Sequence, residues 1–116
     1  MIAMIFEFWL NDDEVDNYTP YSGKMRQLVD EIEGFISVER YRSEYDPDKI
    51  LALGFFRDET AVEKWRNHPA HRQAQQLGRQ KYYTNYRLRM AEVVRDYDRH
   101  NREQVPHDSQ SIHDTN

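Results

Sequence analysis

The sequence contains no cysteine, only four glycines and four prolines, and no long apolar run. Without cysteine the chain has no disulfide, no thiolate metal ligand and no thiol nucleophile. No apolar stretch approaches the ~20 residues that a transmembrane helix needs, so we expect no membrane partner. The four glycines form no glycine-rich nucleotide loop. We expect no metal, because Pro69 breaks the helical face between His68 and His71 and no third ligand is evident.

An excess of basic residues is also missing. The formal net charge of −5 speaks against non-specific nucleic-acid binding, which needs a positively charged surface. The first ten residues are apolar except for Glu7, and they have neither a basic leader nor a small-residue cleavage site. We therefore interpret them as a strand and expect a soluble, cytoplasmic protein.

Apolar residues are scarce for an independent globular domain. They make up 38% of the 116 residues, and charged residues make up 32%. The length predicts a single domain. Eight Tyr and five Phe supply a large buried area per residue, and a subunit interface could supply more. The composition therefore favours an obligate homodimer.

Hydrophobic periodicity predicts the element order β-α-β-β-α-β. The expected elements are strands over 3–10, 35–43, 49–56 and 86–97, a first helix that ends near residue 33, and a helix pair from 58 to about 83. His68 interrupts the pair, because a residue that precedes proline avoids helical torsions. Two starts are open for the first helix: Thr19 as cap with Pro20 in the first turn, or an earlier start with a kink at Pro20. Gly34 is expected to follow this helix in the left-handed conformation.

This order is the split β-α-β, ferredoxin-like arrangement of the α+β class, with an antiparallel sheet and both helices on one face. It covers residues 1–97, and we expect the polar residues 98–116 to form a flexible tail. The other sheet face keeps apolar side chains, among them some of Ile5, Trp9, Phe35, Tyr41 and Phe55. Two subunits that stack these faces would enclose a dimeric α/β barrel. We expect the pocket in this shared interior.

The stretch 65–83 carries the residues that we consider first for chemistry. Trp65 is either a core side chain or an aromatic wall for a flat substrate. Helical spacing places four residues along one side of the second helix of the pair, namely His71, Gln75, Gly78 and Tyr82. A histidine is the best-placed base near neutral pH, although an imidazole here could instead face solvent or cap a helix, as we expect for His68. Gly78, which costs a helix about 1 kcal/mol, indicates that another group packs closely there.

Charged residues are interspersed along the strands. Glu7 lies between Ile5 and Trp9 on its face, so its carboxylate must be paired or have a raised pKa. Arg87 or Arg89 is the natural partner, and either could anchor an anionic oxygen. We interpret the other strand charges as cross-strand ion pairs at solvent-facing or rim positions, namely Glu39, Arg40, Arg42, Glu92 and Arg95.

Residues 1–97 resemble the antibiotic biosynthesis monooxygenase (ABM) family. The resemblance rests on Glu7 in the first strand, on GFISVERY, on DETAVEKWRNHPAHRQAQQLGR and on YRLRMAEVVRDY, with W-x-N-H-P-x-H as its most specific part. It implies a dimeric α+β barrel of ferredoxin-like topology. The family includes cofactor-free oxygenases of polyketide aromatics, small heme-degrading monooxygenases and many members of unknown activity. The resemblance is therefore a better guide to fold than to chemistry.

The polyketide branch is matched in part. By this resemblance Trp65 matches a pocket tryptophan that both branches share, and His71 stands where the polyketide enzymes have a pocket tyrosine. Ala61 stands in place of their asparagine, so that donor is missing. Arg87 lies near the position of their pocket arginine, within a residue or two.

The heme branch is matched less well. Its iron-ligating histidine falls at Gln75, and its first-strand asparagine falls at or beside Glu7, so we disfavour heme and expect no cofactor. We expect a small aromatic substrate, such as a phenol, anthrone or quinol, that loses a proton to His71 and reacts directly with O₂. Its binding residues would be Glu7, Gln75, Tyr82 and Arg87, with Trp65 as the stacking wall. The alternatives are a non-catalytic binding protein for a flat hydrophobic ligand such as heme or a quinone, and a non-oxidative isomerase or lyase.

Overall fold

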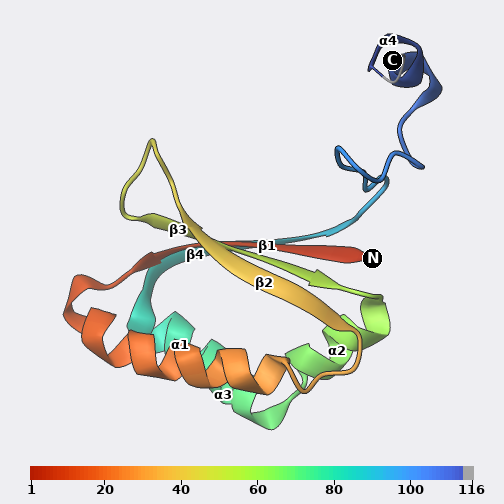
Figure 1. Cartoon of the computed structure of the whole chain (residues 1–116). Helices are drawn as coiled ribbons and strands as arrows, with labels where there is room; N and C mark the ends of the chain where they lie inside the picture. Colours follow the sequence, from red (N-terminus) through yellow and green to blue (C-terminus); the bar gives the residue numbers. More distant parts are fainter. Residues whose placement is uncertain (114–116) are drawn as a thin grey trace.

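The computed structural model describes residues 1–113 and has the predicted β-α-β-β-α-β order (Figure 1). The elements are β1 (Ile2–Leu10), the 3-10 turn η1 (Asp12–Glu14), α1 (Val15–Val29), β2 (Phe35–Arg42), β3 (Lys49–Phe56), α2 (Glu59–Arg66), α3 (Pro69–Leu77), the π-helical turn η2 (Gly78–Tyr82), β4 (Tyr83–Glu92) and α4 (His107–His113). The α+β, ferredoxin-like prediction is confirmed.

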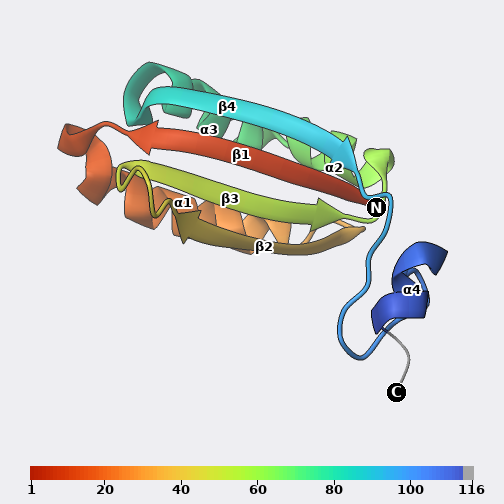
Figure 2. The same ribbon diagram turned by 90° about the horizontal axis from the view of Figure 1, so that it is seen from above.

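The four strands form one antiparallel sheet in the order β2-β3-β1-β4. Helices α1, α2 and α3 all lie on the same side of this sheet (Figures 1 and 2). Since successive side chains of a strand point to opposite faces, β1 divides its residues between the two sides. Phe6 and Phe8 face the helices, where both pack in the same core cluster. Ile5, Glu7 and Trp9 face the other way.

The first helix starts at Val15, with Pro20 inside it on the exposed side. The earlier start is therefore confirmed, and the start at a Thr19 cap is wrong. Gly34 has a φ of 91°, as predicted, but it follows a short turn rather than the last helical residue. A Cβ atom at Gly34 would also lie only 2.7 Å from the Cβ of Ala61, so this position requires glycine for space as well as for torsion.

The helix pair is capped as the sequence predicts. Asp58 accepts a hydrogen bond from the Ala61 N–H at 2.9 Å, which satisfies a free donor at the start of α2. The His68 Nδ1 accepts from the Ala70 N–H at 3.2 Å and caps α3 in the same way. These two caps fix the direction in which α3 leaves α2.

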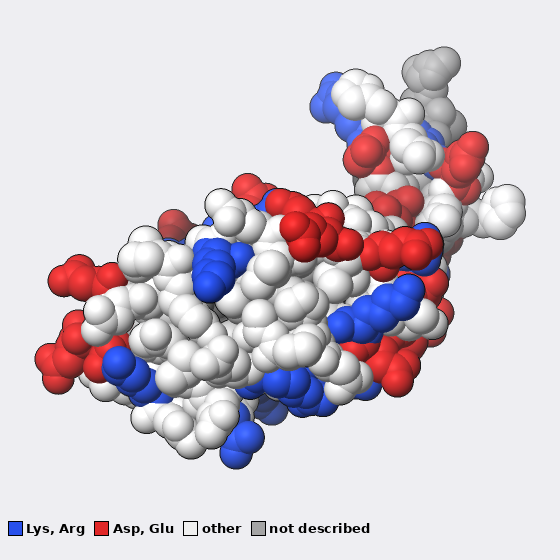
Figure 3. All heavy atoms as spheres, turned by 90° about the horizontal axis from the view of Figure 1, so that it is seen from below, with Lys and Arg blue, Asp and Glu red and all other residues white. Residues whose placement is uncertain are grey.

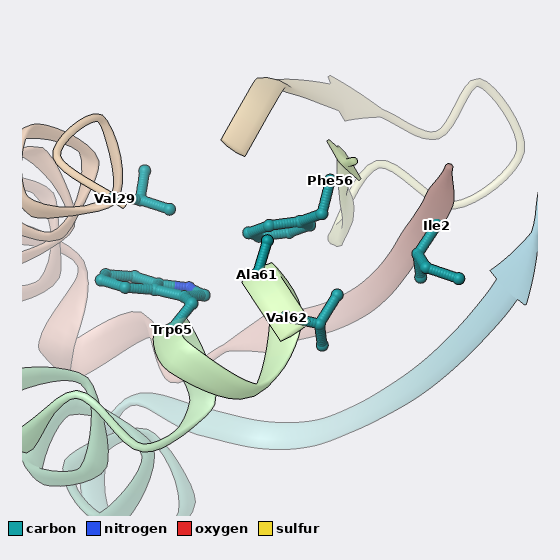
Figure 4. Packing of buried hydrophobic residues seen from close by; sticks show 6 residues of the cluster. All are labelled: Ile2, Val29, Phe56, Ala61, Val62 and Trp65. Carbon is teal, nitrogen blue, oxygen red and sulfur yellow. The ribbon is translucent and has the colours of Figure 1, made fainter. Parts of the chain in front are cut away.

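Buried side chains form two clusters between the helices and the sheet. One joins β1, β3, α1 and α2 (Figure 4) and consists of Ile2, Val29, Phe56, Ala61, Val62 and Trp65. The other consists of Phe8, Tyr18, Ala52 and Tyr82. Burying one large apolar side chain contributes roughly 1.5–3 kcal/mol, so these clusters hold the helices on the sheet.

Within residues 1–113, no helix packs on the opposite face of the sheet, and α4 lies away from it (Figure 1). Ile5, Trp9, Leu53 and Phe55 lie on it and are partly exposed, and Tyr41 is 46% exposed. We call these five residues the open face. Phe35, which we had considered for this side, instead packs against the first core cluster, with its ring 5.5 Å from that of Phe56.

The last strand differs most from the prediction, because it spans Tyr83–Glu92 rather than 86–97. The Val93 N–H still donates to the Met1 carbonyl, but β1 begins at Ile2, so residues 94–113 have no neighbouring strand to pair with. The chain then leaves the sheet, and residues 107–113 form α4 (Figure 1), a helix that the sequence did not predict. The domain boundary at residue 97 and the flexibility of the tail stay predictions. Within residues 1–113, no helix combines the length and apolarity needed to cross a bilayer.

Candidate functional site

A cavity of about 570 Å³ lies between the helices and the sheet and is partly open to solvent. It runs between the two core clusters, since it touches Trp65 and Val29 of one and Phe8 and Tyr18 of the other. Figure 3 shows the helix-bearing side of the molecule, where uncharged atoms occupy much of the centre and charged side chains lie mostly around it. The volume is in the usual range for a small-molecule site.

Four of the six predicted site residues line this cavity: Trp65, His71, Gln75 and Tyr82. Trp65 comes from α2, His71 and Gln75 from successive turns of α3, and Tyr82 from the end of η2. The helical spacing predicted that the last three share a side. This cavity belongs to one chain and lies on the helix side of the sheet. Our expectation that the pocket would be the interior between two subunits is therefore corrected.

Glu7 and Arg87 lie on the opposite side of the sheet from this cavity. They are cross-strand neighbours on β1 and β4, and both side chains lie on the same side of the sheet as the open face. The Glu7 carboxylate pairs with Lys49 and accepts from Arg89 Nη1 at 2.7 Å. These two cations hold the pKa of Glu7 below its usual range, and Lys49 has the larger effect. Of the two expected possibilities for Glu7, a paired carboxylate or a raised pKa, the structure shows the first. It does not bring Glu7 or Arg87 close to His71.

His71 stacks on Trp65, with ring centroids 4.0 Å apart and an angle of 14° between the planes. Its Nδ1 lies 2.9 Å from the Trp65 carbonyl oxygen. A carbonyl oxygen can only accept, so Nδ1 carries the proton and Nε2 of the neutral ring keeps its lone pair. Gln75 Nε2 also lies 3.4 Å from Nδ1, but two donors form no hydrogen bond, and this amide donates to the Arg66 carbonyl at 3.2 Å.

The environment of His71 keeps its imidazole neutral. Burial lowers the pKa of His71, the hydrogen bond to the Trp65 carbonyl raises it, and nearby His68 and Arg72 lower it further, with a net downward shift. A neutral imidazole with a free Nε2 accepts a proton, so the site contains a base that functions at neutral pH. This excludes the alternative of a freely solvated side chain at position 71.

Aromatic side chains fill the other end of the cavity. The hydroxyl groups of Tyr18 and Tyr83 lie 3.3 Å apart, and their rings meet edge to face at 5.8 Å. Burial raises the pKa of Tyr83 far above its ordinary value, and the neighbouring Tyr18 raises it further. Tyr83 therefore remains protonated and can donate or accept a hydrogen bond, but it does not act as an anion. Phe6 and Phe8 complete this wall.

Tyr83 and Arg40 are among the cavity residues that the sequence interpretation missed. Tyr83 stands at the junction of η2 and β4, where neither helical nor strand periodicity assigns a face. Arg40 was interpreted as part of a cross-strand ion pair. It instead lines the cavity, with its guanidinium 5.5 Å from the centroid of the Tyr18 ring. The signal that could have found Arg40 is its alternation with Val38, a partly buried residue on the same side of β2.

Gly78 explains the close approach that the sequence indicated. A Cβ atom there would overlap the Tyr83 ring, whose Cδ2 atom would be 2.9 Å away. Ala61, at the position where the resemblance implies an asparagine, is buried in the first core cluster and contributes nothing to the cavity wall. In the described part of the chain, no three His, Asp or Glu side chains group in a way that could hold a metal ion. The absence of a cofactor stays a prediction.

Comparison with known proteins assigns the family. The sequence matches the antibiotic biosynthesis monooxygenase family over residues 1–77. The chain belongs to the ABM family. The jasmonate monooxygenase ABM of Pyricularia oryzae is 37% identical over 94 residues, a match that covers 81% of this chain and 44% of that protein. The chain thus spans less than half the length of this ABM relative. The uncharacterized protein YqjZ of Bacillus subtilis is 29% identical over 93 residues, covering 80% of this chain and 79% of YqjZ.

Solved structures of other proteins share the fold. A Deinococcus radiodurans protein assigned to the family superimposes with a TM-score of 0.74 at 11% identity, over 84% of this chain and 97% of its own. The Mycobacterium tuberculosis protein Rv0793 has a TM-score of 0.71 at 16% identity, over 84% of this chain and 98% of its own. At these identities the likeness shows the ferredoxin-like α+β fold alone.

Proposed function

We propose that the cavity is the active site of a monooxygenase that oxidises a small cyclic or aromatic compound without a metal or organic cofactor. One observation carries the proposal: a neutral imidazole, with Nε2 free to accept, stacks on an indole inside an apolar cavity. The family and the jasmonate monooxygenase relative support a monooxygenase. The substrate class follows from the aromatic wall.

The reaction begins with proton transfer from an acidic C–H or O–H of the substrate to His71 Nε2. The resulting anion is electron-rich and reduces O₂, with a new C–O bond between the substrate carbon and dioxygen. Loss of water from this peroxide at a former CH₂ group leaves a carbonyl, so one oxygen atom enters the product and the other leaves as water. Trp65 provides the flat surface on which the ring of the substrate lies.

Oxygen consumption tests this proposal. We expect the wild-type protein to consume O₂ with members of a panel of anthrones, hydroquinones and cyclic ketones such as jasmonate, and His71→Ala to lose about 100-fold or more, since general base catalysis contributes about that much. His107→Ala is the matched control, because His107 is an exposed residue of α4. Equal rates for wild type and His71→Ala would show that His71 is not the base.

A second candidate is a binding protein that holds a flat hydrophobic ligand. It is favoured by Ala61, which places a buried methyl group where the resemblance implies a hydrogen-bond donor. In this case the wild-type protein takes up a ligand from the panel without consuming O₂, and His71→Ala binds it as well as wild type does.

A further inference from the structure

Three residues with a formal charge contribute atoms to the cavity wall, namely Arg26, Glu39 and Arg40, although Glu39 lies across from Leu53 and its side chain projects from the opposite face of the sheet. Arg26 pairs with Asp30 one turn further along α1. Glu39 accepts a hydrogen bond from the Tyr41 hydroxyl at 2.8 Å. Within residues 1–113, Arg40 has no carboxylate within ion-pair distance, and its guanidinium lies over the face of the Tyr18 ring. The cavity therefore presents one arginine whose charge is unmatched.

The position of Arg40 makes its charge available to a ligand. It lies on β2, an edge strand, directly across from Ala52 on the helix side of the sheet. The Tyr18 ring restrains the guanidinium through a cation–π contact and leaves its N–H donors free. A planar guanidinium binds a carboxylate through two parallel hydrogen bonds. The Tyr18 and Tyr83 hydroxyl groups, 3.3 Å apart, lie at the same end and can add donors.

Arg40 and His71 belong to opposite halves of the molecule. β2 is one edge of the sheet, whereas α3 lies beneath the half that contains β4 (Figure 2). Between them the wall consists largely of rings, from Phe6 and Phe8 to Trp65. A ligand bound at Arg40 by a charged group would extend its apolar part along these rings towards the imidazole.

We propose that the cavity accepts organic carboxylates, with a cyclic apolar body among the aromatic rings and the carboxylate on Arg40. Arg40 is thus the residue that selects for the anion. This inference names the substrate class of the proposed function. It rests on that function only in taking this cavity as the ligand-binding site.

Binding of matched acids and esters tests the proposal. We would measure, by isothermal titration calorimetry under nitrogen, the affinity for 2-naphthoic acid, cyclohexylacetic acid and phenylbutyric acid and for their methyl esters. We expect wild type to bind at least one acid about tenfold more tightly than its ester. Arg40→Gln should lose this preference, because it should lower the affinity for the acid and leave the affinity for the ester unchanged. Hydrogen bonds between charged groups are stronger than those to a neutral ester.

The control variants separate charge from folding. Arg87→Gln removes an arginine from the opposite side of the sheet and should keep the wild-type preference. Arg40→Lys keeps the charge without the two-pronged geometry and should give an intermediate preference. Equal affinities of wild type for acids and esters, no binding of any compound, or equal weakening of acid and ester by Arg40→Gln would each overturn the proposal. Because no O₂ is present, failure of the proposed oxidation leaves this result unaffected.

Discussion

The stacked pair of Trp65 and His71 shows how a single side chain can be part of the core and of the site. Trp65 is 7% exposed and belongs to the first core cluster, yet its ring and its carbonyl oxygen both contact His71. The carbonyl fixes the tautomer, and the indole fixes the plane of the imidazole. Our two interpretations of Trp65, core residue and aromatic wall, are therefore compatible.

The pKa of His71 leads to a prediction on stability. Burial lowers this pKa in the folded state, so between that value and the unfolded value of about 6.5 the unfolded chain binds more protons. The free energy of unfolding should therefore fall as the pH drops below about 6.5 and level off below the folded pKa. NMR titration of the imidazole and urea denaturation between pH 5 and 8 measure both quantities.

His71→Gln removes the titrating group and should flatten that part of the stability curve. His68 and Arg72, the neighbours that also lower the pKa of His71, are retained in this variant. A His71 pKa at or above 6.5 in the folded protein would contradict the burial that the structure describes.

At the level of elements, the junction of α3, η2 and β4 depends on Gly78. Gly78→Ala would normally favour a helix by about 1 kcal/mol, but here the methyl group would overlap the Tyr83 ring. We expect this variant to be less stable by about 1–3 kcal/mol, as in other overpacked cores. Gly23→Ala in α1 is the control, because a Cβ there meets nothing within 4 Å, and it should be more stable by about 0.5–1 kcal/mol. Urea denaturation checks both, and a gain for Gly78→Ala would contradict the packing.

Sequence periodicity predicted the elements well, and the caps at Asp58 and His68 show why: both depend on neighbours within three residues. Periodicity failed where the bounds of an element depend on residues far away in the sequence. The end of β4 depends on where β1 begins, which lies at the other end of the chain. Arg87 was assigned to the pocket because the resemblance places it near a pocket arginine, within a residue or two, and a shift of one residue along a strand changes the face. The sequence also does not say which side of each strand the helices cover, and this concealed Arg40.

On the scale of the whole molecule, the open face remains to be covered. Its apolar residues, Ile5, Trp9, Tyr41, Leu53 and Phe55, lie beside the ion-paired Glu7 and Arg89. A second copy of the chain would bring an equal apolar surface and matching pairs of opposite charge, and contiguous apolar surface of this kind is typical of protein interfaces.

We therefore expect a homodimer of twice 14.1 kDa in sedimentation equilibrium. Leu53→Glu should give a folded monomer, because it places a charge in the middle of the open face. Leu88→Glu is the control: Leu88 is 53% exposed and lies on the helix side of β4, across from Phe6. A monomeric wild type, or equal dissociation by both variants, would contradict this assembly.

The alternation along β1 has a further consequence for how this protein can change. Insertion or deletion of one residue near the start of that strand would exchange the faces of the residues that follow, so that the Glu7 carboxylate pointed into the cavity and the ring of Phe8 moved to the other side of the sheet. Length variation among related chains should therefore be confined to the connections between strands and helices, whereas β1 keeps its residue count.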